Sequence, residues 1–234
     1  MAMTADQCLD RVREIQEKYK VGGAHPVWKG LDEGTHSVPQ MREFARQFGI
    51  IPLHNHNYHG RLYVSCPNAR WRARLAEVVY EEGTGRLFAD GVSHNELYYR
   101  FGEGLGLSRK DLDNADHCAE ALVYKGWLQH ACGQGTLIGV SAHMLADEGQ
   151  VKGGHFNRIA KTLQQRYGLK PEATAFWSVH DVADEDHSGI GAELLADFAP
   201  TDADKRLVIE TVEQTLGLLR TMYDGIYKRM KAIP

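Results

Sequence analysis

A stretch in the C-terminal part of the chain combines imidazole and carboxylate side chains at helical spacing. In His180-Asp-Val-Ala-Asp184-Glu-Asp-His187, the three residues His180, Asp184 and His187 follow one another at intervals of four and three. An α-helix turns by about 100° per residue, so these three side chains share one stripe. Imidazole and carboxylate suit iron, and two histidines with one carboxylate are a recurrent non-haem iron ligand set. The stripe therefore predicts a metal site on a helix.

The length of the stripe bears on the number of metal ions. His180 and His187 lie roughly 10 Å apart along a helix axis, which suits two ions about 3.5–4 Å apart better than one. The alternative is an acidic, solvated helix face, because Asp181, Glu185 and Asp186 crowd the same segment. Ligands elsewhere in the chain decide between the two interpretations.

Composition limits the classes of function. The chain has 234 residues, of which 43% are hydrophobic and 25% charged, as in ordinary globular proteins. The net charge is −4 and the basic residues are scattered, so nucleic acid is not expected as a partner. The N-terminus lacks a signal-peptide pattern, and nowhere do roughly 18 apolar residues run together. We expect a cytoplasmic protein that does not contact the membrane.

The cysteines give no sign of a metal ribbon or a disulfide framework. Cys8, Cys66, Cys118 and Cys132 are far apart and form no CxxC pair. Reduced thiols are expected.

Helix signals recur along the chain, whereas strand signals do not. Capping residues, prolines and apolar periodicity predict helices from Thr4 to about Lys20, Ser37 to about Val64, Pro67 to Glu82, Ser93 to about Gly106, Ser108 onward, Ala115 to Cys132, Leu137 to Gly168, Pro171 through the stripe, and Asp202 to Met230. The predicted fold is all-α, a single domain of seven or eight helices over residues 1–234. Such bundles build metal sites from inward side chains on facing helices.

Residues on other predicted helices can complete a metal site. Glu81 and Glu82 end one helix, His94 begins the next, and Glu148 sits in a helix interrupted by glycines. Each taken alone is equally explained as an exposed polar residue, because isolated charged side chains are mostly at the surface.

Taken together, these residues resemble a known family, the haem-oxygenase-like diiron oxidases and oxygenases, relatives of pyrroloquinoline-quinone synthase and thiaminase II. The family pattern is a Glu-Glu-Gly helix end, a histidine opening the next helix, a glutamate on a middle helix and then His-x3-Asp-x2-His. The segment His25-Pro26-Val27-Trp28 also looks like the family's N-terminal entry. The resemblance implies a haem-oxygenase-like fold in which two Fe(II) ions are bound by Glu81, His94, Glu148, His180, Asp184 and His187.

Two departures from the family pattern qualify the ligand set. The loop between Glu81 and His94 is longer than in the family, which leaves a choice between Glu81 and Glu82, with Glu81 favoured. Thiaminase II has a nucleophilic cysteine shortly before a glutamate on the middle helix. Here the nearest cysteine, Cys132, comes too early, so we expect it to be a small core residue.

The activity implied by the resemblance is oxidation of a small organic substrate with O2 as co-substrate. Amino acids, their derivatives and fatty acids are the expected substrates, and N-oxygenation, desaturation and C–C cleavage are the expected outcomes. Two alternatives stay open: a metal-free pocket enzyme like pyrroloquinoline-quinone synthase, and a non-catalytic binding protein of the same fold. A homodimer is compatible with the family.

Other histidines have less specific explanations. His25 could be offered as a haem ligand, but it precedes Pro26 in an expected loop, and a haem leaves the other ligands unexplained. His54, His56 and His59 cluster on one predicted helix, where only His56 and His59 can project together. Surface or pocket-lining roles are expected for this cluster rather than a metal site.

Overall fold

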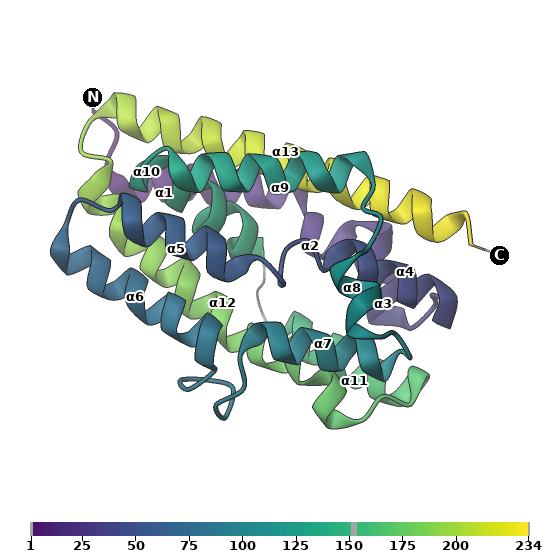
Figure 1. The fold of residues 1–234 in the computed structure, drawn as a ribbon. Helices are drawn as coiled ribbons and strands as arrows, with labels where there is room; N and C mark the ends of the chain where they lie inside the picture. Colours follow the sequence, from purple (N-terminus) through teal and green to yellow (C-terminus); the bar gives the residue numbers. More distant parts are fainter. Residues whose placement is uncertain (1, 151–153, 234) are drawn as a thin grey trace.

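The computed structural model describes residues 2–150 and 154–233, and in this part of the chain the secondary structure is helical, without strands (Figure 1). The helices are α1 (Ala5–Tyr19), α2 (Val21–Ala24), α3 (Pro26–Glu33), α4 (Val38–Phe48), α5 (Asn55–Ser65), α6 (Ala69–Thr84), α7 (His94–Gly104), α8 (Arg109–Asp113), α9 (Ala119–Gly133), α10 (Thr136–Gly139), α11 (His155–Tyr167), α12 (Pro171–Phe198) and α13 (Asp202–Lys231). A π-helical segment, η1 (Val140–Asp147), and a short 3₁₀ turn, η2 (Glu148–Gln150), follow α10. The all-α prediction is confirmed.

Local capping explains where several helices begin. The side chains of Thr4, Ser37, Ser108 and Thr201 each accept a hydrogen bond from the backbone three residues on, and the side chain at that position bonds back. These reciprocal caps satisfy backbone N–H groups that have no partner within the helix. The helix starts predicted at these residues are therefore confirmed.

Two of the expected long helices are each divided in the structure. The stretch expected from Ser37 to Val64 breaks between α4 and α5, where Pro52 cannot donate a backbone hydrogen bond. The stretch expected from Leu137 to Gly168 contains the π-helical turn of η1 and ends before Gly154, whose φ of 71° is left-handed. The prediction of one continuous helix from Ser37 was wrong, because it followed apolar periodicity through Pro52, whereas the interruption by glycines after Glu148 was expected.

The two longest helices organise the bundle. The helix α12 packs against α7, α11 and η1, while α13 packs against α9, α1 and η1. Figure 1 shows α13 beside α9 along one edge of the molecule and α12 running beneath α5 and beside α6. The segment η1 thus contacts both long helices, which brings its side chains into the middle of the bundle.

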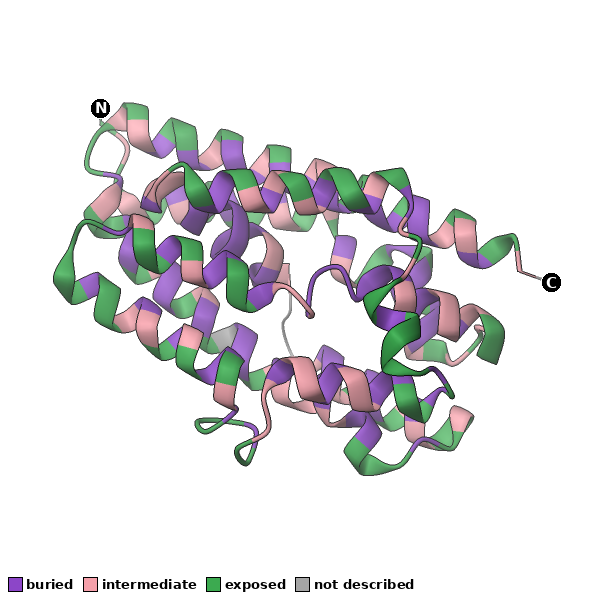
Figure 2. Cartoon of the chain, in the orientation of Figure 1, coloured by how far each residue is buried: buried purple, intermediate pink, exposed green. Residues whose placement is uncertain are grey.

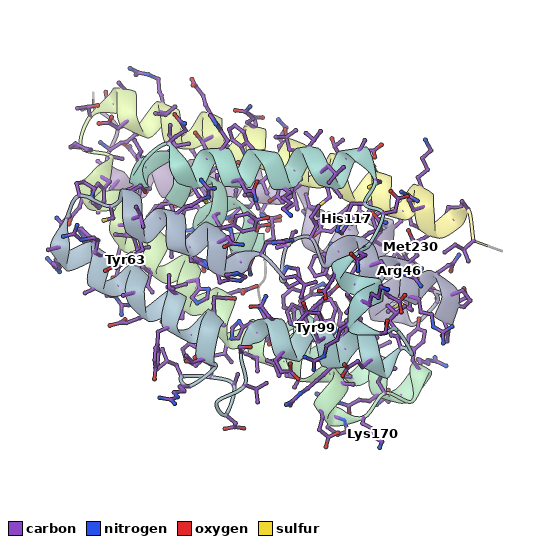
Figure 3. All side chains as sticks on the ribbon, viewed as in Figure 1. Arg46, Tyr63, Tyr99, His117, Lys170 and Met230 are labelled. Atoms are coloured by element: carbon purple, nitrogen blue, oxygen red, sulfur yellow. The ribbon has the colours of Figure 1, made fainter. Side chains whose placement is uncertain are left out.

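Buried side chains form one hydrophobic core cluster that extends from Cys8 to Met230. Figure 2 shows that the buried positions follow the inward faces of the helices. The side chains fill the space between the helices in Figure 3, where the labelled Tyr63 and Lys170 lie at opposite ends of the molecule. Among the described residues, no helix combines the length and apolar character that a bilayer-spanning segment needs.

Candidate metal centre

The stripe on α12 faces the interior. His180, Asp184 and His187 are buried, whereas Asp186 on the same helix is exposed. His180 Nδ1 lies 2.7 Å from the carbonyl oxygen of Phe176, one turn earlier. The Nδ1–H group donates this bond, so the Nε2 lone pair is free to bind a metal.

Three residues from three helices converge at one end of the stripe, and we call them the Glu82 group: Glu82 at the end of α6, His94 at the start of α7, and His180 on α12. One ligand atom of each lies within 4.8 Å of the others. Glu82 Oε1 is 3.1 Å from His94 Nδ1, and the rings of His94 and His180 are 4.6 Å apart.

The neighbouring Glu81 is placed differently from Glu82. Its carboxylate accepts backbone hydrogen bonds from Leu87 (2.6 Å) and Phe88 (3.1 Å), in the loop after α6. Its Oε1 also lies 3.1 Å from His94 Nε2, on the far side of the ring from Glu82. The long loop that distinguishes this chain therefore engages Glu81, and the structure brings Glu82 into the group in its place.

A second set of ligand atoms converges at the other end of the stripe, and we call it the Glu148 group: His59 on α5, Glu148 on η2, and His187 on α12. Glu148 Oε1 lies 3.1 Å from His59 Nε2 and 3.4 Å from His187 Nδ1. Asp184 lies between His180 and His187 on the stripe, and thus between the two groups.

Sequence reasoning missed His59. It paired His56 with His59, but the structure exposes His56 and buries His59 completely. The buried residues of α5 are Asn55, Tyr58, His59 and Leu62. Their spacing of three, four and seven is that of one helix face, and this signal could have placed His59 inward.

Many polar atoms in the two groups are buried without a hydrogen-bond partner among the described residues. They are both ring nitrogens of His59, Oε1 of Glu82, Nδ1 of His94, Oε2 of Glu148, and Nε2 of His180 and His187; Nε2 of His143, which lies beside the Glu148 group, is in the same condition. Some of these atoms lie within hydrogen-bonding distance of another polar atom, but the angles do not suit a hydrogen bond. Glu82 Oε1 and His94 Nδ1, which are 3.1 Å apart, are an example. Buried polar groups without partners are rare and call for an explanation such as a bound ion. Imidazole and carboxylate atoms gathered within 4.8 Å of one another fit iron.

Electrostatics in the Glu82 group reflect a buried ion pair. Burial alone would lower the pKa of His94, but Glu82 and Glu81 on either side of the ring outweigh it and raise the pKa to about 9. Burial alone would raise the pKa of Glu82, but His94, His59 and His180 hold it well below the usual range. Burial, together with the positive charge of His94, lowers the pKa of His180 to about 3.

Asp184 is the carboxyl group that lacks such compensation. Burial and then the charges of Glu148, Glu82 and Asp147 raise the pKa of Asp184 well above its usual range. Members of both groups are thus among the charges that act on Asp184. Three imidazoles, by contrast, hold the pKa of Glu148 far below its usual range in spite of burial. A cation beside Asp184 would offset the repulsion that it meets.

A cavity of about 60 Å³ adjoins the stripe and is lined by His180, Asp184 and Glu148. Aromatic side chains form much of its remaining wall, namely Trp28, Phe48, Phe156, Phe176 and Tyr223. No lysine or arginine lines it in the described part of the chain. The cavity suits a small, largely apolar molecule held next to the ligand atoms.

Two further residues singled out in the sequence have structural contacts. His25 caps α3 by accepting the Val27 N–H at Nδ1, and its Nε2 lies 3.1 Å from Asp224 Oδ1. Both ring nitrogens are engaged, which disfavours His25 as a haem ligand. Cys132 is fully buried in the core, as expected.

Comparison with known proteins found similar sequences. The model of a family described as iron-containing redox enzymes matches residues 42–220. A curated relative, 4-aminobenzoate synthase from Nitrosomonas europaea, is 23% identical over 209 residues, which cover 87% of this chain and 85% of the relative.

Solved structures share the fold at low sequence identity. A domain from Shewanella denitrificans described as having a haem-oxygenase-like fold superposes with a TM-score of 0.73 at 14% identity, covering 95% of this chain and 91% of the other. A TenA homologue from Pseudomonas syringae pv. tomato superposes with a TM-score of 0.76 at 11% identity, covering 95% and 92%. The all-α fold is therefore haem-oxygenase-like.

Proposed function

The chain belongs to the iron-containing redox enzymes, and from that premise we propose that it binds two iron ions and uses O2 to oxidise a small organic substrate. The Glu82 group and the Glu148 group would each hold one ion, with Asp184 between them. One observation carries the proposal: two sets of buried, unpartnered ligand atoms converge at the two ends of one helical stripe.

Each part of the centre has a distinct role in this proposal. Fe(II) ions held by these residues would supply electrons to O2 and would compensate the carboxylate charges. The protein fixes the two histidine rings. The carbonyl oxygen of Phe176 orients His180 at Nδ1, and the carboxylate of Glu81 orients His94 at Nε2, which leaves the other nitrogen of each ring for an ion. The buried walls exclude water from the reacting atoms.

The aromatic cavity favours a planar or otherwise compact apolar substrate over a long chain. Its walls are rings, and His180, Asp184 and Glu148 are part of its lining, so a molecule bound there lies next to the proposed ions. The relative from Nitrosomonas europaea is named for an aromatic product, 4-aminobenzoate, which supports an aromatic substrate here. Among the expected substrates, aromatic amino acids and their derivatives fit the cavity better than fatty acids.

Iron stoichiometry and O2 consumption test the proposal together. Metal-free protein loaded anaerobically with Fe(II) is expected to bind two ions per chain, and His180→Ala and Glu148→Ala to lose one or both and to stop consuming O2. Asp186→Ala is the matched control, because Asp186 is exposed on the same helix. Saturation at one ion would favour a mononuclear site, and no binding at all would favour the metal-free or binding-protein alternatives.

A further inference from the structure

The histidine at position 143, which lies outside both groups as defined, has the features of a metal ligand. Its ring is completely buried, and its Nε2 has no hydrogen-bond partner among the described residues. That nitrogen lies 3.7 Å from Glu148 Oε1, and the ring centre lies 4.4 Å from that of His59. His143 therefore presents an unused nitrogen to the Glu148 group.

The other ring nitrogen of His143 is held by a carboxylate. Nδ1 lies 3.2 Å from Asp147 Oδ2, while Asp147 Oδ1 accepts a hydrogen bond of 2.8 Å from the hydroxyl of Tyr124. With both oxygens of Asp147 engaged, the neutral ring donates Nδ1–H to Asp147 and keeps a lone pair on Nε2. A carboxylate that orients a histidine in this way is a regular accompaniment of metal ligation.

The π-helical turn of η1 explains how His143 and Glu148 come to lie on the same side. The backbone N–H of Glu148 donates to the carbonyl oxygen of His143, five residues earlier. In a regular α-helix, residues five apart point about 140° away from each other. The wider turn stacks them instead, and such turns occur frequently at functional sites.

We propose that His143 is a fourth protein ligand of the ion in the Glu148 group. The ion would then be bound by the imidazoles of His59, His143 and His187 and by the carboxylate of Glu148. Asp147 and Tyr124 are positioning residues that hold His143 in the ligating form. This inference rests on the proposed function, and it makes the Glu148 group richer in imidazole than the Glu82 group.

The donor sets lead to an order of filling. A late first-row ion such as Co(II) binds imidazole-rich sites more tightly than sites rich in oxygen. Co(II) added to the metal-free protein should therefore occupy the Glu148 group first, and the first equivalent should depend on His143.

Anaerobic Co(II) titration with a competing chelator tests the inference without any turnover. Visible absorption of the bound ion reports its coordination, and competition gives the affinity of each equivalent. For His143→Gln and His143→Leu we expect the first equivalent to bind at least tenfold more weakly with an altered spectrum, while the second changes by less than twofold. For Asp147→Asn we expect a loss of 10- to 100-fold in the affinity of the first equivalent.

Controls separate this inference from folding and from the proposed function. His130→Gln removes an exposed histidine and should leave both equivalents unchanged. Thermal unfolding of the metal-free variants checks their folding: leucine removes the Nδ1 donor to Asp147 along with the unpartnered Nε2, so some loss of stability is expected for it, and glutamine keeps an N–H donor. If wild type binds two ions and both His143 variants match it in affinity and spectrum, the inference is overturned while the proposed function stands. If wild type binds none, both fail.

Discussion

At the scale of single residues, Glu81 and Glu82 show how adjacent identical side chains acquire different surroundings. Successive positions on a helix diverge by about 100°, so one glutamate faces the stripe while the other meets the following loop. Glu82 joins His94 and His180, whereas Glu81 accepts two backbone hydrogen bonds and contacts the outer nitrogen of His94. From the sequence Glu81 was favoured over Glu82, and the loop that engages Glu81 carries no recognisable motif.

Substitution by glutamine separates the two glutamates. Glu82→Gln should abolish one equivalent of iron, since it removes an anionic ligand atom. Glu81→Gln should still bind two equivalents of iron, but the affinity for one of them should fall by about 10- to 100-fold. This is the usual effect of losing a partner that orients a metal ligand. Iron titration with a chelator measures both. The reverse pattern would restore Glu81 as the ligand.

Replacement of Asp184 should stabilise the metal-free protein and impair metal binding. Burial and neighbouring carboxylates raise its pKa well above the usual range. At neutral pH, folding therefore requires the carboxyl group to take up a proton, which costs free energy that asparagine avoids. For Asp184→Asn we expect a gain of about 1–3 kcal/mol in the free energy of unfolding, or about 2–4 °C in Tm per kcal/mol for a chain of this size.

The control for this prediction is Asp186→Asn, an exposed position on the same helix. Its effect on unfolding should stay within about 0.5 kcal/mol. Calorimetry on metal-free protein makes the measurement, and a destabilised Asp184→Asn variant would show that the carboxylate has a favourable partner after all.

The pH should act in opposite directions on metal-free stability and on metal affinity. The pKa of His94 is raised to about 9 in the folded, metal-free protein. Its stabilising contribution is therefore complete below an unfolded pKa of about 6.5 and is lost as the pH rises through about 9. Over the same range metal affinity should rise, because the ion must displace the proton from His94.

Measurements from pH 6.5 to 9 can test this opposition. We expect Tm of the metal-free protein to fall while Co(II) affinity rises by about tenfold per pH unit for each proton displaced. Glu82→Gln removes the main charge that raises the pKa of His94, so it should flatten the trend in Tm and remove the equivalent whose affinity depends on His94. Affinity that is independent of pH would exclude proton displacement from His94.

At the scale of elements, the α12 stripe was the most predictable part of the site. Helical spacing places His180, Asp184 and His187 on one face whatever the rest of the fold, and the structure buries all three. The position of Glu148 depends on η1, where the helix departs from regular geometry. Periodicity assumes regular winding, so neither the π-helical turn nor the inward direction of His143 could be predicted from it.

Close packing between α5 and the segment before η1 gives a prediction at this scale. A Cβ atom at Gly139 would lie 2.2 Å from Leu62 Cδ2 and 3.0 Å from Cys132 Cα. Gly139→Ala should therefore destabilise the fold by about 1–3 kcal/mol. It should also weaken the Glu148 group, because α5 carries His59.

Gly126→Ala on α9 is the matched control. A Cβ atom there has no neighbour within 4 Å, so the substitution should stabilise by about 0.5–1 kcal/mol. Urea unfolding compares the two variants, and equal effects would contradict the close approach at Gly139.

At the scale of the whole molecule, the fold class followed from the capping signals and from the absence of strand patterns. What the sequence did not yield is the convergence of α5, α6, α7, η2 and α12 on one centre. That convergence depends on contacts between segments distant in the chain, and these are set by packing rather than by local propensity. The resemblance of an ordered ligand pattern to a family supplied most of that long-range information.

Metal binding should stabilise the entire bundle, since the ligands join helices from both halves of the chain. With free metal at a hundredfold excess over Kd, one site adds about 2.7 kcal/mol, which raises Tm by about 5–10 °C. Anaerobic thermal unfolding with and without Fe(II) measures the shift. The double variant Glu82→Gln/Glu148→Gln should show none, and a shift that persists in it would place the metal elsewhere.

The π-helical turn has a consequence for how this chain tolerates changes in length. Most surface loops accept the gain or loss of a residue, and a one-residue deletion between His143 and Glu148 would restore α-helical winding here. Such a deletion would leave the two residues four apart, about 40° from each other on a regular α-helix, so that they would still lie on one side. In evolutionary terms, a single codon lost between His143 and Glu148 would change their spacing in the sequence while both side chains still faced the same side. Descendants with that deletion would keep the shared face but not the spacing of the ligand pattern.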